Sequence, residues 1–149
     1  MGAREFVTRA PRSWLILVGL GLAMLPSCAG AGRPEQQPVT LSIANASQEP
    51  LRCMILFAHF VATDVGTIAP NDDLSLAMFR QDEDGALFIP RADGRRMMIE
   101  TIDCGSASRW AETRGQISLL PARAGRDARY GTACRLRGAV TCAEPAPLP

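Results

Sequence analysis

Apolar and polar residues alternate along much of the chain, which is the pattern of strands in a half-buried β-sheet. Val39, Leu41 and Ile43 share one side of the first such stretch. Residues 51–61 are apolar apart from Arg52 and His59, and this longer run predicts a strand that is buried on both faces. Further strands are predicted at residues 74–80, 86–89, 97–104 and 116–120.

Turn-forming residues separate the predicted strands. Stretches rich in Pro, Asn, Asp and Gly lie at residues 45–50, 70–73, 81–85 and 90–94. Strands that recur about every 8 to 15 residues with such turns between them favour an antiparallel sheet over helical or βαβ architectures. We therefore expect an all-β fold, an immunoglobulin-like or similar β-sandwich of about seven short strands.

The composition divides the chain into four parts. Residues 1–27 have the character of an export signal, residues 28–38 are small and polar like a flexible tether, residues 39–142 form the predicted sandwich, and residues 143–149 are expected to be a disordered tail. Within the sandwich domain, residues 106–113 predict a short helical turn or an irregular crossing, and residues 122–130 predict a loop.

The first 27 residues carry the features of a cleavable secretory signal. Arg4, Arg9 and Arg12 precede an apolar run at residues 14–25. That run is shorter than the ~20 residues that a membrane-spanning helix needs. We therefore expect export by the general secretion route and removal of this segment.

The sequence Leu25-Pro26-Ser27-Cys28 resembles the lipobox of bacterial lipoproteins. The resemblance implies a diacylglycerol on Cys28 and cleavage just before it, so that the protein is held in the membrane by acyl chains such as palmitate. Ala29, which is not aspartate, implies sorting to the outer membrane, facing the periplasm. The alternative is ordinary cleavage after Ala29 or Ala31, which releases a soluble periplasmic protein.

The cysteine count agrees with lipid attachment, because five cysteines are an odd number and assigning Cys28 to lipid leaves four. Two disulfides are then expected in an oxidising compartment, and three pairings are possible in principle. We favour Cys134 with Cys142, because a three-residue loop at residues 137–139 would place them opposite one another on a hairpin. Cys53 and Cys104 remain for the second bridge. A metal site is not predicted, because the chain has no Cys-x-x-Cys pair and one histidine.

The charge balance argues against nucleic acid as a partner. The whole chain has a formal net charge of +1, and removal of the signal leaves about −1, whereas nucleic-acid binding usually needs a strong basic excess. A group of arginines near the C-terminus could still contact an anionic glycan or an acidic envelope protein. The favoured alternative is that these arginines only keep the surface soluble, since arginine supplies every positive charge in this chain. These residues are Arg114, Arg123, Arg126, Arg129, Arg135 and Arg137.

Few residues suggest a catalytic, metal-binding or ligand-binding role. His59 lies in an apolar segment without a nucleophile at a recognisable spacing, so a packed or edge histidine is favoured over a catalytic base. The acidic residues 82–84 lack the ligand spacing of a calcium loop and indicate a solvated turn. Trp110 and Tyr130 are expected to pack in the core rather than to anchor a binding surface. No cofactor is predicted.

These observations predict a non-enzymatic, lipid-anchored envelope protein that acts as a binding or assembly module. A second reading is a lipoprotein subunit of a larger envelope or secretion complex, which follows from the expected location alone. A third and weaker reading is a small periplasmic hydrolase that uses His59.

Overall fold

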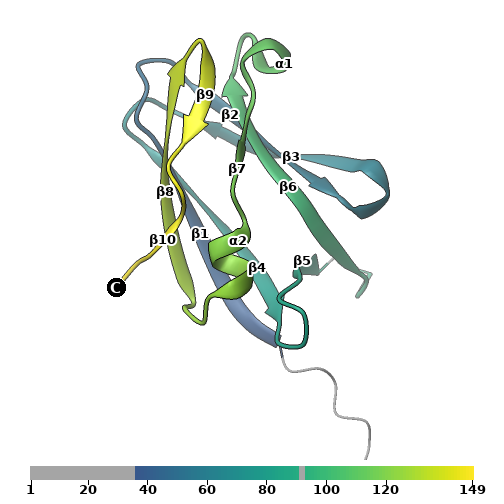
Figure 1. Ribbon diagram of the computed structural model, residues 1–149. Coiled ribbons are helices and arrows are strands. Elements are labelled where there is room, and N and C mark those ends of the chain that lie inside the picture. The colour runs from purple at the N-terminus through teal and green to yellow at the C-terminus, as the bar shows by residue number, and fades with distance from the viewer. Residues whose placement is uncertain (1–35, 91–92) are drawn as a thin grey trace, which may run out of the picture. The chain divides into compact units, whose positions relative to one another are not determined.

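The computed structural model describes residues 36–90 and 93–149, which are mostly β-structure as predicted (Figure 1). The predicted signal segment, Cys28 and the predicted tether up to residue 35 lie outside the described residues. Residues 36–38, predicted as the end of the tether, are instead the start of a strand. The helical elements are the 3-10 turn η1 (Ala58–Phe60) and the short helices α1 (Trp110–Thr113) and α2 (Leu120–Ala124). The strands are β1 (Gln36–Asn45), β2 (Leu51–Phe57), β3 (Val61–Ile68), β4 (Asp73–Gln81), β5 (Leu87–Pro90), β6 (Arg96–Ser106), β7 (Gly115–Ile117), β8 (Arg129–Arg137), β9 (Ala139–Cys142) and β10 (Ala146–Pro147).

The strands of the described residues hydrogen-bond in the order β10-β8-β1-β4-β5-β6-β2-β3, with β7 on β6 and β9 on β8. Strands β1 and β8 run parallel, whereas the other pairs are antiparallel. The sheet is therefore mixed and has ten strands, and the prediction of about seven strands in a purely antiparallel arrangement is wrong. Alternation shows which residues are half-buried but not which strand lies alongside. Most of the chain separates β1 from β8, so no tight turn forces them to run antiparallel.

The alternating residues form the core as expected. Val39, Leu41 and Ile43 of β1 are at most 1% exposed, and the residues between them are partly exposed. Strand β2 alternates in the same way and is not buried on both faces. Strands from both halves of the sheet order contribute to one core, which includes Leu51, Ile55, Met78, Ile99, Ile102, Ile117, Tyr130 and Val140.

The predicted strand at residues 51–61 is interrupted. It ends at Phe57, turns through η1 and returns as β3, which pairs with β2 from Phe57 opposite Val61 to Leu51 opposite Ile68. The prediction missed this hairpin because the turn contains no Gly, Pro, Asn or Asp, the residues by which hairpin turns are recognised.

Two segments near the C-terminus also differ from expectation. Residues 120–124 form α2 instead of the end of a strand followed by a loop, because Pro121 stands in the first turn of a helix, where its missing N–H costs nothing. The tail expected to be disordered contributes β10, and Leu148 N–H donates to the Arg129 carbonyl at 3.0 Å. The Leu148 side chain packs where Gly131 has no side chain of its own, which gives this short segment a place on the sheet.

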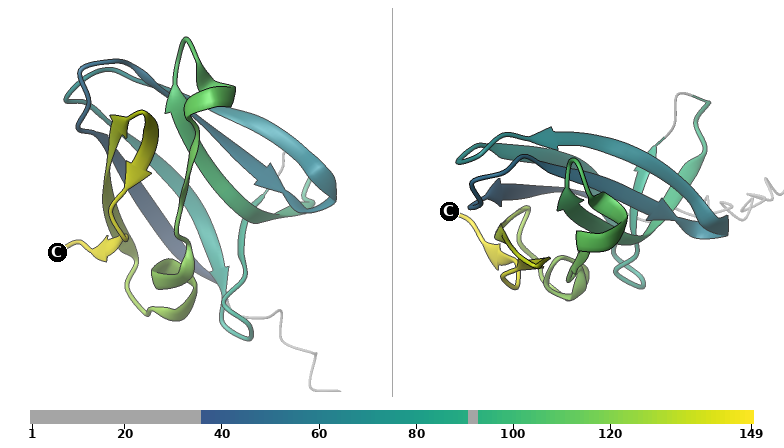
Figure 2. Two further views of the ribbon diagram at one scale, coloured as in Figure 1. Left: turned by 45° about the horizontal axis from the view of Figure 1, so that its top comes forward. Right: turned by 90° about the horizontal axis from the view of Figure 1, so that it is seen from above.

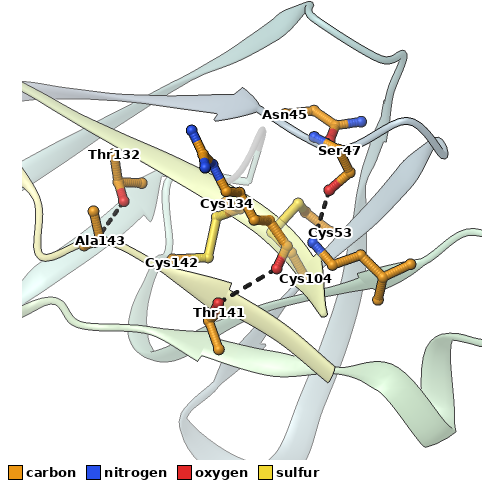
Figure 3. Close-up of a disulfide and its surroundings, with 11 residues drawn as sticks. Asn45, Ser47, Cys53, Cys104, Thr132, Cys134, Thr141, Cys142 and Ala143 are labelled. Atoms are coloured by element: carbon orange, nitrogen blue, oxygen red, sulfur yellow. Dashed lines mark hydrogen bonds between the residues drawn. A yellow bond between two sulfur atoms is a disulfide. The ribbon is translucent and has the colours of Figure 1, made fainter. Parts of the chain in front are cut away.

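Both predicted disulfides are present (Figure 3). Cys134 and Cys142 face each other across the β8–β9 hairpin, in the register that also pairs Leu136 with Val140. Cys53 and Cys104 face each other across β2 and β6. One bridge thus closes a local hairpin, whereas the other joins strands that are 51 residues apart in the chain.

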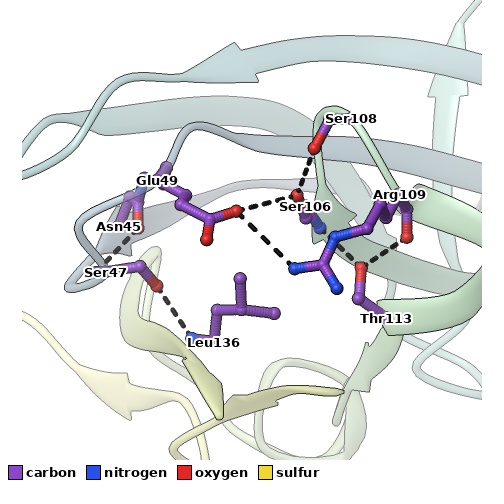
Figure 4. A network of polar contacts seen from close by, with 8 residues as sticks. All are labelled: Asn45, Ser47, Glu49, Ser106, Ser108, Arg109, Thr113 and Leu136. Carbon is purple, nitrogen blue, oxygen red and sulfur yellow. Dashed lines mark hydrogen bonds and ion pairs between the residues drawn. The ribbon is translucent and has the colours of Figure 1, made fainter. Parts of the chain in front are cut away.

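A buried polar corner connects the turn after β1 to two other elements (Figure 4). Asn45, which is 1% exposed, donates through Nδ2 to the carbonyls of Glu49 and Ile68, each at 2.9 Å. Its Oδ1 accepts the Ser47 N–H, and Ser47 Oγ in turn accepts the Leu136 N–H at 2.8 Å. The corner therefore ties together the ends of β1, β3 and β8.

Candidate functional site

The most exposed large apolar side chain that the structure describes lies at the end of the β2–β3 hairpin. Phe60 is 88% exposed and its neighbour Val61 is 43% exposed. The hairpin extends away from β1, β8 and β9 in each view (Figure 2). We call residues 58–61 the hairpin tip.

The backbone of the hairpin tip is strained. His59 has φ 66° and Phe60 has φ 62°, so two consecutive non-glycine residues occupy the left-handed region. That conformation places Cβ close to the following carbonyl and costs about 1–2 kcal/mol per residue. Strain of this size in an exposed turn needs a reason beyond folding, and it is often found at binding sites.

The strands behind the tip hold it in a fixed place. Strand β2 is paired on one side with β3 and on the other with β6, to which the Cys53–Cys104 bridge also ties it. On the exposed face Arg52 Nη2 lies 2.7 Å from Asp64 Oδ2, an ion pair further back along the hairpin. The tip thus presents an apolar side chain on a hairpin that β6 and the disulfide hold in place.

The sequence favoured a packed or edge position for His59, and the structure shows it exposed at the tip and not packed. Among the described residues, no hydroxyl or carboxylate is hydrogen-bonded to its imidazole. A general base in an acyl-transfer site is usually oriented by such a partner. The position of His59 therefore suits a contact residue better than a base.

The structure brings together two of the six arginines that were predicted as possible contacts to an anionic partner. Arg123 and Arg126, at the end of α2, line a pocket together with Arg80 of β4. Arg129 Nη1 donates to the Pro149 carbonyl at 2.7 Å. The others lie towards the β8–β9 hairpin, at the opposite end of β8 from α2 (Figure 1). These are Arg114, whose guanidinium lies 5.3 Å from the centre of the Trp110 ring, and the exposed Arg135 and Arg137.

Sequence reasoning missed Arg80, although a signal was present. Arg80 continues the alternation of Leu76 and Met78 on the inward side of β4, and it is 4% exposed. A charged residue at a core position of a strand is uncommon, because burial of a charge is costly unless it is compensated. That departure from the pattern could have singled it out.

Three other predicted features have plain structural roles. Tyr130 is 1% exposed and belongs to the core, as expected, whereas Trp110 is half-buried beneath the Arg114 guanidinium. The acidic residues 82–84 form the exposed turn between β4 and β5, where the Ala86 N–H donates to Asp84 Oδ1 at 2.9 Å. In the described ranges no group of three His, Cys, Asp or Glu side chains could hold a metal ion.

Comparison with known proteins finds no protein family and no curated protein that matches the chain. In the part of the chain that the structure describes, none of the helices has the length and apolar character to cross a membrane.

Proposed function

We propose that the protein is a lipid-anchored binding module of the bacterial cell envelope, which contacts an envelope protein through the hairpin tip. The observation that carries this proposal is the tip itself: a strained turn without glycine that holds Phe60 88% exposed. Single aromatic residues that insert into a recess are frequent energetic centres of protein interfaces. The exposed apolar side chains of Phe60 and Val61 suit an apolar recess of a protein rather than a glycan or a nucleic acid.

The disulfides support the anchoring part of the proposal. The structure pairs Cys53 with Cys104 and Cys134 with Cys142, which leaves Cys28 as the odd one of five cysteines. A lipid on Cys28 would give that sulfur a role, and the bridges suit an oxidising compartment. We place the protein at the outer membrane facing the periplasm, with a soluble periplasmic form as the alternative.

The immunoglobulin-like sandwich is also a proposal. It is supported by the single core to which the strands of both halves of the sheet order contribute. A sandwich that displays a hairpin loop at its end would be a rigid support for binding, because loops on such scaffolds carry the contacts.

Two other functions follow from the sequence. A subunit of a larger envelope or secretion complex would use the same tip. It would differ from the binding module in that its partner is bound permanently. A hydrolase would use His59, and would lose a measurable activity on substitution of His59 by Ala. We favour the binding module, because a role in presenting Phe60 to a partner gives a reason for the strained turn. A hydrolytic role of His59 gives no reason for it.

The hairpin tip can be tested by photo-crosslinking in intact cells. A crosslinking amino acid in place of the exposed Ala62, next to the tip, should give one discrete protein adduct. Phe60→Ser should abolish that adduct, because it removes the apolar contact. Leu120→Ser is the matched control, since Leu120 is also an exposed apolar residue, at 68%, but lies on α2.

The control should leave the adduct unchanged, and both variants should unfold at the temperature of the parent protein because both side chains are exposed. An adduct that survives Phe60→Ser, or one that contains lipid and no protein, would refute a protein partner at the tip.

A further inference from the structure

A second site lies at the end of the molecule where β1 begins. Here a pocket of about 300 Å³ lies between the start of β1, the turn from β4 to β5, and the end of α2. We call it the arginine pocket. Its lining includes Gln37, Arg80, Asp82, Arg123, Gly125 and Arg126.

Arg80 is a buried cation that is held by neutral groups. Its Nη1 donates to the carbonyls of Ala122, at 3.0 Å, and of Asp127, at 3.4 Å, and its Nη2 donates to Gln37 Oε1 at 2.5 Å. In the described residues no carboxylate forms an ion pair with it. Guanidinium has five N–H groups, so its Nε hydrogen and one Nη2 hydrogen remain for another acceptor. A buried charge without a counter-charge is costly, and an anion in the pocket would relieve that cost.

The wall of the pocket holds further donors. Arg123 Nη2 donates to the Ile99 carbonyl at 2.8 Å, but the buried Nε of Arg123 has no hydrogen-bond acceptor in the described part of the chain. The buried hydroxyl of Tyr130 also lacks a partner there, and it lies directly behind Gly125, where a side chain would collide with it. Buried polar groups are nearly always hydrogen-bonded, so two such atoms beside one pocket need an explanation, and a bound ligand would supply one.

The charges of the lining indicate the class of ligand. Arg80, Arg123 and Arg126 contribute three positive charges, and the exposed Asp82 contributes one negative charge. A phosphate monoester carries about −1.5 to −2 at neutral pH, which balances this excess better than a single carboxylate does. The planar fork of arginine also matches the oxygen atoms of phosphate.

We propose that the arginine pocket binds a phosphate monoester. The phosphate could belong to a soluble phosphorylated sugar or to the headgroup of a lipid, and the same donors would recognise either. This site is separate from the hairpin tip, so failure of one proposal leaves the other standing.

The test uses the protein as it is isolated from cells, with glucose 1-phosphate as the soluble probe and calorimetry as the readout. Arg126→Gln should weaken binding about tenfold, the effect of losing one charge-assisted hydrogen bond. Asp82→Asn should strengthen binding, because it removes the negative charge of the lining. Both side chains are exposed, so neither substitution should disturb folding. Arg80 is less suitable, because it also holds the Ala122 and Gln37 oxygens.

Arg137→Gln is the matched control, because it makes the same charge change at an exposed arginine on the far end of β8. It should leave the affinity within about twofold of the parent protein, which is the spread expected for a distant, screened charge. Equal weakening by Arg126→Gln and Arg137→Gln would mean attraction by overall charge and would overturn the proposal.

A vesicle arm identifies the source of the phosphate. Phosphatidic acid vesicles, compared with phosphatidylcholine vesicles, are tested with the Cys28→Ala protein, so that a lipid at Cys28 does not contribute. Binding to phosphatidic acid that is lost in Arg126→Gln supports a lipid headgroup, and binding of glucose 1-phosphate alone supports a soluble ligand. Absence of binding in both arms, or equal binding of unphosphorylated glucose, overturns the site.

Discussion

At the scale of single residues, His59 and Phe60 are the positions where the fold departs most from what their side chains prefer. Asn and Gly tolerate positive φ, whereas a bulky residue rarely adopts it. Here both central residues of the turn do so, at φ 66° and 62°. The rest of the hairpin, through β2, β6 and the Cys53–Cys104 bridge, must hold this conformation in place. Selection for stability alone would favour Asn-Gly at such a turn.

His59→Gly should therefore stabilise the protein and weaken its binding. Glycine adopts φ 66° without steric cost, and after its larger entropy in the unfolded chain the net gain should be about 0.5–1 kcal/mol. Urea unfolding would measure the gain, and the crosslinked adduct at position 62 should decrease because Phe60 is no longer held in one orientation.

Ala58→Gly is the control for this substitution, because Ala58 does not have a positive φ. It should destabilise the protein by about 0.5–1 kcal/mol, the usual cost of glycine. If both variants lower the free energy of unfolding, the turn is not strained.

At the scale of elements, the sequence predicted the strands whose residues alternate and missed the features that alternation does not encode. Residues 39–44 and 74–80 are strands because one face is buried. The bend at His59 carries no turn residue, and the parallel neighbour of β1 is set by packing between segments far apart in the chain. The same limit applies to the sites, because Arg80 and Arg126 meet only once α2 packs beside the end of β4.

The two disulfides should differ in their contribution to stability. Both predicted pairings are confirmed, and they close loops of different length, with separations of 51 and 8 residues. In the chain-entropy treatment the longer loop is worth about 4 kcal/mol and the shorter about 2.5 kcal/mol. Replacement of Cys53 and Cys104 by Ala should thus lower the free energy of unfolding more than replacement of Cys134 and Cys142.

Urea unfolding of the two double variants measures this difference directly. Each variant removes two buried or half-buried sulfur atoms, so the loss of packing is similar and the loop length is the main variable. A larger loss of unfolding free energy from the Cys134 and Cys142 replacement would show that local strand pairing, and not chain entropy, sets the contribution of the bridges.

At the scale of the whole molecule, the anchor proposed at Cys28 and the domain would have to act together. Seven residues separate Cys28 from the start of β1 at Gln36. A fully extended chain of that length spans at most about 25 Å. A lipid on Cys28 would therefore keep the start of β1, and the arginine pocket beside it, near the membrane, where phosphorylated headgroups are concentrated.

Cys28→Ala should release the protein from the membrane into the soluble periplasmic fraction and abolish labelling with a radioactive fatty acid. The acyl chains on Cys28 would be the only attachment of the protein to the membrane. Two or more such chains are needed for stable anchoring. The small residues Ala29 and Ala31 still offer an ordinary cleavage site, so the variant should be exported and processed.

The double replacement of Cys134 and Cys142 by Ala is the control, because it removes cysteines without touching the anchor and should remain in the membrane. Membrane association that persists in Cys28→Ala would refute lipid attachment, and a chain that still begins at Met1 with reduced thiols would refute export itself.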